Sequence, residues 1–249
     1  MKRITIILIS SIFFIAGSIK AQDLDEILAR HHEVNGMDKL QKIEAIKITG
    51  KSFQMGMETP FTNIMMRPDK FYLEVPVQGQ LMKQAYDGET GWMIAPWTGS
   101  LDPMELTGEQ LRGLKMQADM DGMLYNYEEK GYKTEFVGAE DFEGSEVYVI
   151  RQESEEGDVY KHYIDADSYV LIKTLSTMIM QGAEVEFTSF YSDYKPVDGI
   201  LMAHSIEVDM GQQGQRKVNI ETVEYDPEVD ESIFEKPAPL DATPTDEGQ

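Results

Sequence analysis

The sequence predicts a mainly β protein: an open, half-closed antiparallel β-barrel of about eleven strands whose concave face is covered by helices. Apolar residues recur with a period of two from Ile43 onward, and clusters of Gly, Asp, Asn and Pro separate the runs. The connections between runs are short, which favours pairing between strands that are neighbours in the sequence. Two stretches with helical periodicity must dock on an apolar surface, and the concave face of a curled sheet is the largest one that this chain offers.

Residues 1–21 have the composition of a signal peptide. Lys2 and Arg3 precede an apolar run that is shorter than the roughly 20 residues of a bilayer span, and Ala21 is a small residue at the expected cleavage point. An uncleaved membrane anchor is the alternative interpretation. The sequence therefore predicts export to the periplasm with cleavage near Ala21. The chain has no Cys, which excludes disulfides and the Cys-linked lipid anchor of bacterial lipoproteins.

The segment after the predicted cleavage point begins with an amphipathic helix. Asp23 and Glu26 form a capping box, which predicts that the helix starts at Asp23. Asn35-Gly36 is typical of a helix end, and a second short helix is expected directly after it. One face of the first helix is predicted to dock on the sheet, and it is formed by Leu24, Ile27, Leu28 and His31.

The first half of the predicted sheet ends in a clearly marked hairpin. Pro60 is expected to interrupt an early strand. Residues 85–94 form a strand, a turn and a second strand, because the Asp-Gly pair between the strands tolerates the positive φ that a tight turn requires. Trp92 and Met93 point to opposite faces of the returning strand. The sequence leaves open which of the two faces the concave side.

A helical insertion separates the two halves of the predicted sheet. Thr107 and Gln110 form a second capping box, which predicts a helix that continues to about Gln117. The Asp-Met-Asp-Gly stretch at residues 119–122 breaks this helix and is a candidate hinge. We expect residues 111–124 to act as a lid on the concave face.

The strand pattern resumes after the insertion and continues almost to the end of the chain. A shift in the apolar alternation near Thr222 indicates a β-bulge or a strand exit. No linker or internal repeat divides residues 22–236, which predicts a single domain, and residues 237–249 are expected to form a disordered acidic tail. The strands expected after the insertion are residues 133–138, 146–153, 160–165, 170–180, 183–194, 202–210 and 215–225.

Charge and motif content argue against several classes of function. The net charge of −23 at pH 7 argues against nucleic acid as a partner. The sequence contains no phosphate loop, dinucleotide fingerprint or nucleophile elbow, and its four His residues lack metal-ligand spacing. We therefore predict no enzyme, no catalytic residue, no cofactor and no metal site. An acidic cluster at one hairpin tip is interpreted as a solvated turn, with Ca²⁺ binding as the alternative; it comprises Glu153, Glu155, Glu156 and Asp158.

The order of the elements and two short motifs resemble a known family. Signal peptide, N-terminal helix, β-meander and inserted helix follow one another as in the LolA-like family of periplasmic outer-membrane lipoprotein carriers and sorting proteins. This chain is longer and more acidic than the usual member, which leaves its cargo open. The residues that carry the resemblance are Arg67-Pro68 and Phe71, then Asp87-Gly88, Trp92 and Pro96, and finally Phe234 and Pro237.

The resemblance implies an acyl-chain cavity between a half-open barrel and a helical lid. Arg67 occupies the position of an Arg that bonds the lid backbone in those carriers; a surface Arg at a strand end is the alternative interpretation. The many Met residues of the strands and the lid fit either ordinary core filling or a deformable wall that faces lipid. The candidate cavity and lid residues are Arg67, Phe71, Leu73, Met82, Trp92, Met93, Leu111, Leu114, Met120 and Met123.

The function that the resemblance implies is transport of lipoprotein acyl chains through the periplasm, as a carrier or chaperone in outer-membrane lipoprotein sorting. The expected partners are the acyl chains of lipoproteins or another lipid, an inner-membrane exporter and an outer-membrane acceptor, and the expected state is a monomer. The alternative function is an envelope sensor or protein-binding module of the same fold that transfers no lipid.

Overall fold

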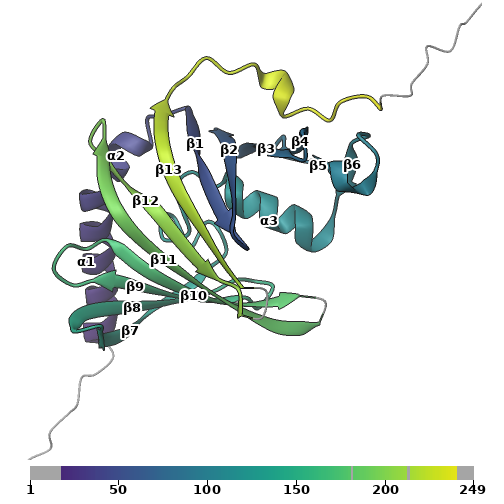
Figure 1. Ribbon diagram of the computed structural model, residues 1–249. Helices are drawn as coiled ribbons and strands as arrows, with labels where there is room; N and C mark the ends of the chain where they lie inside the picture. Colours follow the sequence, from purple (N-terminus) through teal and green to yellow (C-terminus); the bar gives the residue numbers. More distant parts are fainter. Residues whose placement is uncertain (1–17, 181, 212–213, 240–249) are drawn as a thin grey trace, which may run out of the picture.

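The chain forms one curved antiparallel sheet, as the computed structural model in Figure 1 shows. The structure describes residues 18–180, 182–211 and 214–239, with side chains from Leu24 onward. Within these residues the sheet has 13 strands in the order β6-β5-β4-β3-β2-β1-β13-β12-β11-β10-β9-β8-β7. The sheet does not close, and it confirms the expected open barrel. The strands are β1 (Ala45–Gln54), β2 (Met57–Met66), β3 (Lys70–Val77), β4 (Gln80–Tyr86), β5 (Gly91–Ile94), β6 (Met104–Leu106), β7 (Lys133–Phe142), β8 (Ser145–Glu153), β9 (Val159–Asp165), β10 (Leu171–Met180), β11 (Ala183–Val197), β12 (Ile200–Asp209) and β13 (Gln215–Tyr225).

The first hairpin differs from the sequence-based expectation. It turns at Met55-Gly56, where both residues have positive φ, 50° and 76°, as in a two-residue hairpin turn of type I′. The expected interruption at Pro60 is wrong, because Pro60 lies inside β2, opposite Lys51 of β1. The pairing of β2 with β3 begins only at Thr62, so the missing N–H of Pro60 faces an unpaired side of the strand.

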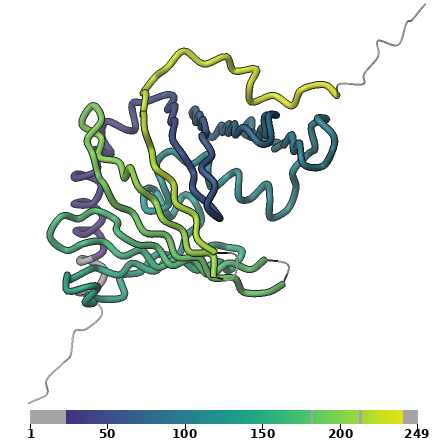
Figure 2. Tube along the Cα trace, in the orientation of Figure 1, coloured from purple at the N-terminus to yellow at the C-terminus, as the bar shows by residue number. Residues whose placement is uncertain are grey.

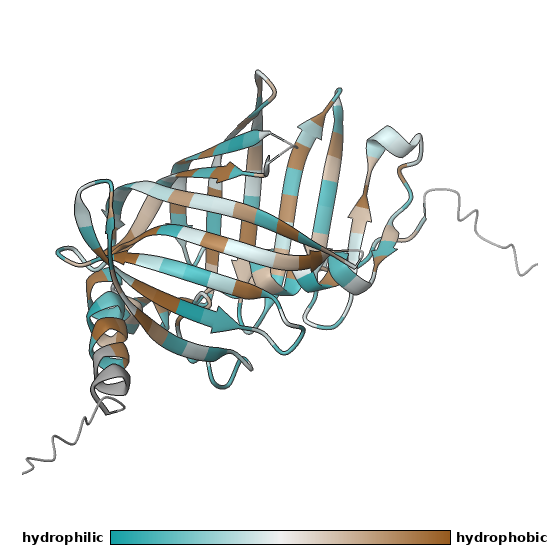
Figure 3. Cartoon of the chain, turned by 90° about the horizontal axis from the view of Figure 1, so that it is seen from below, coloured by the Kyte–Doolittle hydropathy of each residue, from teal (hydrophilic) through white to brown (hydrophobic). Residues whose placement is uncertain are grey.

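The middle of the chain lies at both edges of the sheet, while the first and last strands pair at its centre. The edge strands β6 and β7 are joined by residues 107–132, which we call the insertion; it contains α3 (Gly108–Ala118). Figure 2 shows that the insertion passes along the inner side of the curved sheet. Hydrophobic and hydrophilic residues alternate along most strands in Figure 3, as expected of strands with one face turned to the core.

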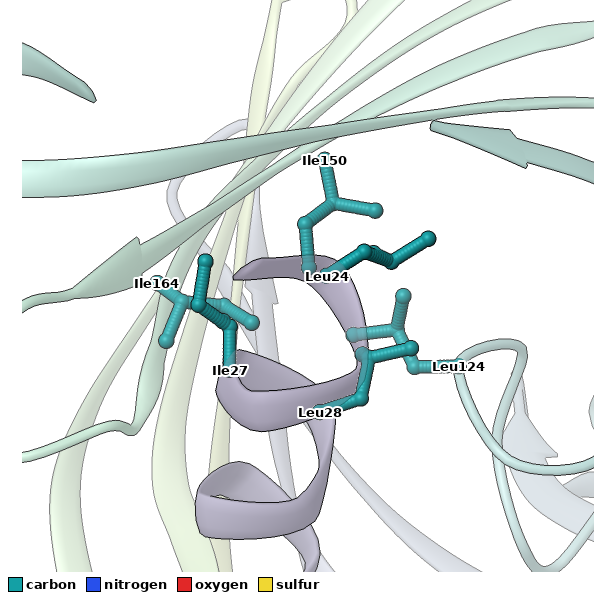
Figure 4. Packing of buried hydrophobic residues seen from close by; sticks show 6 residues of the cluster. All are labelled: Leu24, Ile27, Leu28, Leu124, Ile150 and Ile164. Atoms are coloured by element: carbon teal, nitrogen blue, oxygen red, sulfur yellow. The ribbon is translucent and has the colours of Figure 1, made fainter. Parts of the chain in front are cut away.

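The N-terminal helix packs on the β7–β9 end of the sheet. α1 (Ser18–Asn35) is followed by a residue with positive φ, Gly36, and by α2 (Met37–Leu40). The predicted start at Asp23 is wrong, because α1 begins earlier and the preceding Lys20-Ala21-Gln22 favours helix. Residues 1–17 of the predicted signal peptide lie outside the described residues. Figure 4 shows the apolar contacts of α1, which join Leu24, Ile27 and Leu28 to Ile150, Ile164 and Leu124.

No helix in the described part of the chain is long and apolar enough to cross a membrane.

The residues after β13 cross the convex face of the sheet. We call residues 226–239 the C-terminal strap; Figures 1 and 2 show it running from the end of β13 over the β3–β5 end of the sheet. A short 3₁₀ turn, η3 (Glu231–Ile233), places Phe234 against Tyr72, Ala85 and Trp92, where Phe234 is only 1% exposed. The indole Nε1 of Trp92 donates a hydrogen bond to the carbonyl oxygen of Phe234 at 2.8 Å. Residues 240–249 of the predicted tail lie outside the described residues.

Gly50 marks the irregular pairing of β1 with β13, and we predict that its replacement destabilises the sheet. The register shifts between Thr49 and Gly50. A Cβ atom on Gly50 would collide with the carbonyl oxygen of Asn219 and approach the ring of Phe61 to 2.9 Å. Because backbone atoms cannot move aside without distorting the strand pairing, Gly50→Ala should lower the free energy of unfolding by about 2 kcal/mol, measured by denaturant titration.

The matched control for this prediction is Gly113→Ala in α3. A Cβ atom there meets nothing within 4 Å, and Ala is favoured over Gly in a helix by about 1 kcal/mol. The control should therefore be neutral or slightly stabilising. Equal stability of the native chain and Gly50→Ala would contradict the steric argument.

Candidate functional site

The insertion covers the concave face through three successive apolar contacts. Leu114 and Ala118 of α3 are fully buried against the β3–β5 end of the sheet. Met120 packs against Ile46 and Ile48 at the centre. Leu124 packs with α1 on β8 and β9. The insertion is thus fixed at both ends and in the middle.

Several predicted site residues lie together beneath α3. The cluster contains Phe71 and Leu114 at its centre, and Leu73, Met93 and Leu111 pack around them. Met82 lies opposite Val75 in the β3–β4 pairing and is half-buried, outside this cluster.

The structure resolves which of Trp92 and Met93 faces inward. Met93 packs in the cluster beneath α3, and Trp92 packs against Phe234 of the C-terminal strap on the opposite face. Trp92 therefore contributes to the convex side and not to the wall of the concave side. The two sequence motifs around Trp92 and Phe234 are in direct contact.

Arg67 joins the insertion to the segment that precedes β1. Its guanidinium donates to both carboxylate oxygens of Asp121, from Nη1 at 3.0 Å and from Nη2 at 2.6 Å. It also donates to the carbonyl oxygens of Ile43 and Leu40, at 2.9 and 3.1 Å. The hydrogen bonds to Asp121 and the negative charge of its carboxylate raise the pKa of Arg67, and partial burial acts in the opposite direction. The bidentate geometry is the strongest form of an Arg–carboxylate contact.

The stretch predicted as a hinge is held by a second ion pair. The ammonium group of Lys130 donates to both carboxylate oxygens of Asp119, at 2.8 and 2.7 Å, and to the carbonyl oxygen of Gly122 at 2.8 Å. Together with the Arg67–Asp121 pair, this contact fixes the two Asp residues of the stretch. Movement of the insertion away from the sheet requires that the Arg67–Asp121 pair break, whereas the Lys130–Asp119 pair lies within the insertion and holds its shape.

A third ion pair connects α3 to the hairpin between β8 and β9. Asp158, whose side chain is 2% exposed, lies 3.3 Å from Nη1 of Arg112 and accepts a hydrogen bond from the backbone N–H of Ile179 at 2.9 Å. One member of the acidic cluster thus neutralises an Arg of the insertion. Among the described residues, no group of three or more His, Asp or Glu side chains is arranged to hold a metal ion.

A cavity of about 440 Å³ lies between the insertion, the N-terminal helices and strands β9–β11. This volume is in the range of small-molecule sites in proteins. The insertion, the N-terminal helices and the strands all contribute apolar side chains to its wall. The apolar lining residues are Met37, Met116, Met123, Leu124, Leu171, Met178 and Phe187.

The strand side of the cavity carries a buried polar network that the sequence reasoning missed. The Oε1 of Gln152 lies 2.9 Å from Nε2 of His162, and the Nδ1 of His162 lies 3.2 Å from Oγ1 of Thr174. The side-chain amide of Gln152 donates to the carbonyl oxygen of Met123 at 3.0 Å. The network therefore ties the floor of the cavity to the insertion. Polar residues at the inward positions of apolar strands were the available signal.

Burial keeps the histidines of the cavity neutral. Desolvation, with a smaller effect from His31, lowers the pKa of His162 to about 3. Desolvation also lowers the pKa of His32 to about 4, and that of His31 is lowered for the same reason. These imidazoles thus enter the cavity wall as uncharged hydrogen-bonding groups.

The neutral state of His162 predicts a loss of stability in acid. Its pKa is 6.5 when unfolded and about 3 when folded, so between these values the unfolded chain binds the proton and the folded chain does not. The stabilising contribution is complete above about pH 6.5 and declines as the pH falls, by about 1.4 kcal/mol per pH unit. In His162→Gln, the unfolding free energy should therefore fall less steeply as the pH is lowered, and the difference in slope should equal this contribution.

A second measurement covers the case in which His162→Gln does not fold. In the native chain, the imidazole resonances of His162 should not titrate between pH 7 and 4 when followed by nuclear magnetic resonance. A titration midpoint near 6.5 would refute the assignment of a desolvated imidazole.

Known structures share this architecture at low sequence identity. A DUF1329 family protein from Desulfovibrio piger matches with a TM-score of 0.60 and 13% identity, over 84% of this chain and 97% of its own. A LolA superfamily protein from Nitrosomonas europaea has a TM-score of 0.60 and 11% identity, over 87% of this chain and 98% of its own. An outer membrane lipoprotein-sorting protein domain from Vibrio parahaemolyticus has a TM-score of 0.55 and 14% identity, over 86% and 97%. No family model and no curated protein matches the sequence.

These likenesses extend over most of each chain, and they agree with the open sheet and its helical cover. They establish the fold, since identities this low carry no further conclusion. The chain therefore has a LolA-like fold, an open antiparallel β-barrel whose concave face is covered by helices.

Proposed function

We propose that this protein binds acyl chains of lipoproteins in the cavity beneath the insertion and carries them through the periplasm. The observation that carries this proposal is the cavity of about 440 Å³ between the insertion, α1 and strands β9–β11, with its wall of Met, Leu and Phe side chains. Burial of each methylene group in such a wall contributes about 0.8 kcal/mol. The Met residues suit the wall to chains of different shape.

The mechanism requires no catalytic step. An acyl chain enters when the insertion lifts from the sheet, and the Arg67–Asp121 and Arg112–Asp158 ion pairs close again over it. Release needs a partner that opens these pairs or offers a better apolar site, and an inner-membrane exporter and an outer-membrane acceptor would be such partners. The likeness to a lipoprotein-sorting domain supports this assignment.

The proposal is tested by the lipid that the exported protein holds. The protein is purified from the periplasm without detergent, and bound acyl lipid is measured by mass spectrometry. Ser176→Phe fills the cavity and should reduce the bound lipid several-fold, because Ser176 lines the cavity wall. The matched control Ser192→Phe places the same ring on an exposed position of β11 and should retain the lipid.

Two outcomes would contradict the proposal. One is a native protein that holds no acyl lipid and whose thermal unfolding is unchanged by added lipopeptide. The other is equal lipid content in Ser176→Phe and Ser192→Phe.

A further inference from the structure

The half of the sheet that contains β1–β6 has two ends of opposite character. These strands follow one another in the sheet, so every second connection emerges at the same end. One end carries the turns at residues 67–69 and 87–90, each of which contains acidic residues. The other end carries the connections β1–β2, β3–β4 and β5–β6, where residues 55–57, 78–81 and 95–101 include no Asp, Glu, Lys or Arg. We call these three uncharged segments the apolar rim.

The apolar rim exposes large hydrophobic side chains to water. Met55 and Met57 are 81% and 66% exposed, Trp97 is 59% exposed and Leu81 is 43% exposed. The two turns at the opposite end of the same strands contain no large hydrophobic residue. Exposed apolar side chains are ordinary when they are scattered, but their concentration at one end of a sheet indicates an interaction surface.

The shape of the apolar rim selects the kind of partner. Met55 and Gly56 form the tip of a hairpin, and side chains on such a tip protrude and enclose nothing. They suit a partner that deforms around them, as the head-group region of a lipid membrane does, and Trp is among the residues that are enriched there. Because strand ends of an open barrel surround one opening, a flat surface can touch several tips at once.

A cation without a partner lies beside the tip of the β1–β2 hairpin. Arg216 lines the same surface hollow as Met55. The two carboxylates of this hollow belong to Glu58 and Glu207, and each is paired with a Lys ammonium, at 2.8 and 2.6 Å. Arg216 itself forms no ion pair within the described residues. The phosphate of a lipid head group would give its guanidinium an acceptor.

The charge of the whole chain decides which lipid head groups are suitable. The net charge of −23 at pH 7 repels an anionic membrane surface at long range. A zwitterionic membrane presents phosphate groups without a net charge. Such a membrane therefore offers a partner to Arg216 and an apolar layer to the exposed Met and Trp side chains.

We propose that the apolar rim docks on zwitterionic lipid membranes, with Met55, Met57 and Trp97 entering the head-group region and Arg216 facing its phosphates. The inference does not depend on the proposed function, because none of these residues lines the cavity beneath the insertion. It goes beyond that function by giving the chain a surface with which to approach a bilayer directly.

The test mixes the full exported protein with vesicles of dioleoylphosphatidylcholine and separates bound from free protein by flotation. We expect binding to these vesicles and at least about fivefold weaker binding, at low salt, when half of the lipid is dioleoylphosphatidylglycerol. The fluorescence of Trp97 gives a second measurement, since Trp92 is only 2% exposed. The emission should shift to shorter wavelength on binding, and Trp97→Gln should abolish this shift.

A double variant tests the apolar rim itself. Met55→Gln with Met57→Gln removes the apolar tip without adding charge, and it should weaken vesicle binding at least about tenfold. Gln is tolerated at positive φ in the β3–β4 turn, where Gln78 has a φ of 52°. The matched control is Val34→Gln with Val137→Gln, whose side chains are also exposed but lie on α1 and β7. The control should bind vesicles as the native chain does.

Three outcomes would overturn the inference. One is a native chain that does not bind the zwitterionic vesicles, and another is equal binding of the two double variants. The third is a native chain that is dimeric in sedimentation velocity and monomeric as Met55→Gln with Met57→Gln, because a second copy then occupies the apolar rim. The cavity variant Ser176→Phe should bind vesicles as the native chain does, so loss of bound acyl lipid and loss of docking are separate results.

Discussion

A Phe234→Ala variant should unfold with a free energy about 4 kcal/mol below that of the native chain. Phe234 is 1% exposed and fills the space between Tyr72, Ala85 and Trp92 on the convex face. Its removal leaves a cavity beside the indole ring of Trp92, while the backbone carbonyl that accepts the indole hydrogen bond is retained. Denaturant unfolding gives the change in stability, and the fluorescence of Trp92 should shift to longer wavelength as water reaches the ring.

The matched control for this prediction is Phe190→Ala, which removes the same ring from a position that is 37% exposed. It should cost about 1 kcal/mol, because much of the Phe190 ring is in water already. A Phe234→Ala variant that is as stable as Phe190→Ala would mean that the strap rests on the sheet without supporting it.

Arg67→Met should lower the free energy of unfolding by about 3 kcal/mol, because it leaves the mostly buried carboxylate of Asp121 without an ion-pair partner. The side chains of Arg67 and Asp121 are 21% and 16% exposed, and the guanidinium makes four hydrogen bonds. The insertion should also loosen, so limited proteolysis should cut between residues 107 and 132 faster than in the native chain.

Two comparisons isolate the role of the Arg67–Asp121 pair. Lys70→Met breaks an ion pair with Glu231, whose side chain is 58% exposed, and should cost less than about 1 kcal/mol. Adding Asp121→Leu to Arg67→Met should restore at least about 1 kcal/mol of unfolding free energy, because the unpaired charge of Asp121 is then removed. If the double variant is no more stable than Arg67→Met, the unpaired carboxylate of Asp121 is not the cause of the loss of stability.

Local patterns in the sequence were sufficient to predict the antiparallel sheet. Alternation of apolar residues and turn signals predict the antiparallel neighbours, because hairpins form between adjacent segments. The turn at Met55-Gly56 was missed, since Met at positive φ is unusual and the apolar alternation continues through it. The predicted start of α1 was wrong because residues that would form a capping box at the start of a helix can also occur inside a longer helix.

The contacts that define the site depend on residues far apart in the chain. Arg67 was named from a motif, but its partner Asp121 is one of 45 acidic residues, and no local pattern selects it. The orientation of Trp92 follows from Phe234, 142 residues away. The network around His162 needed the register of β8, β9 and β10, which fixes the side chains that share a face.

The pairing of β1 with β13 has a consequence for the order in which the protein folds. The backbone N–H of Glu44 is bonded to the carboxylate of Asp226, 182 residues later in the chain. Each half of the sheet is a series of local hairpins that can form early, whereas this central pairing closes a very long loop and raises the contact order. The two halves can therefore join only after the last residues of β13 have been made and are free to pair. Until then the unpaired sides of β1 and β12 are open strand edges, which are sites where chaperones act and aggregation begins.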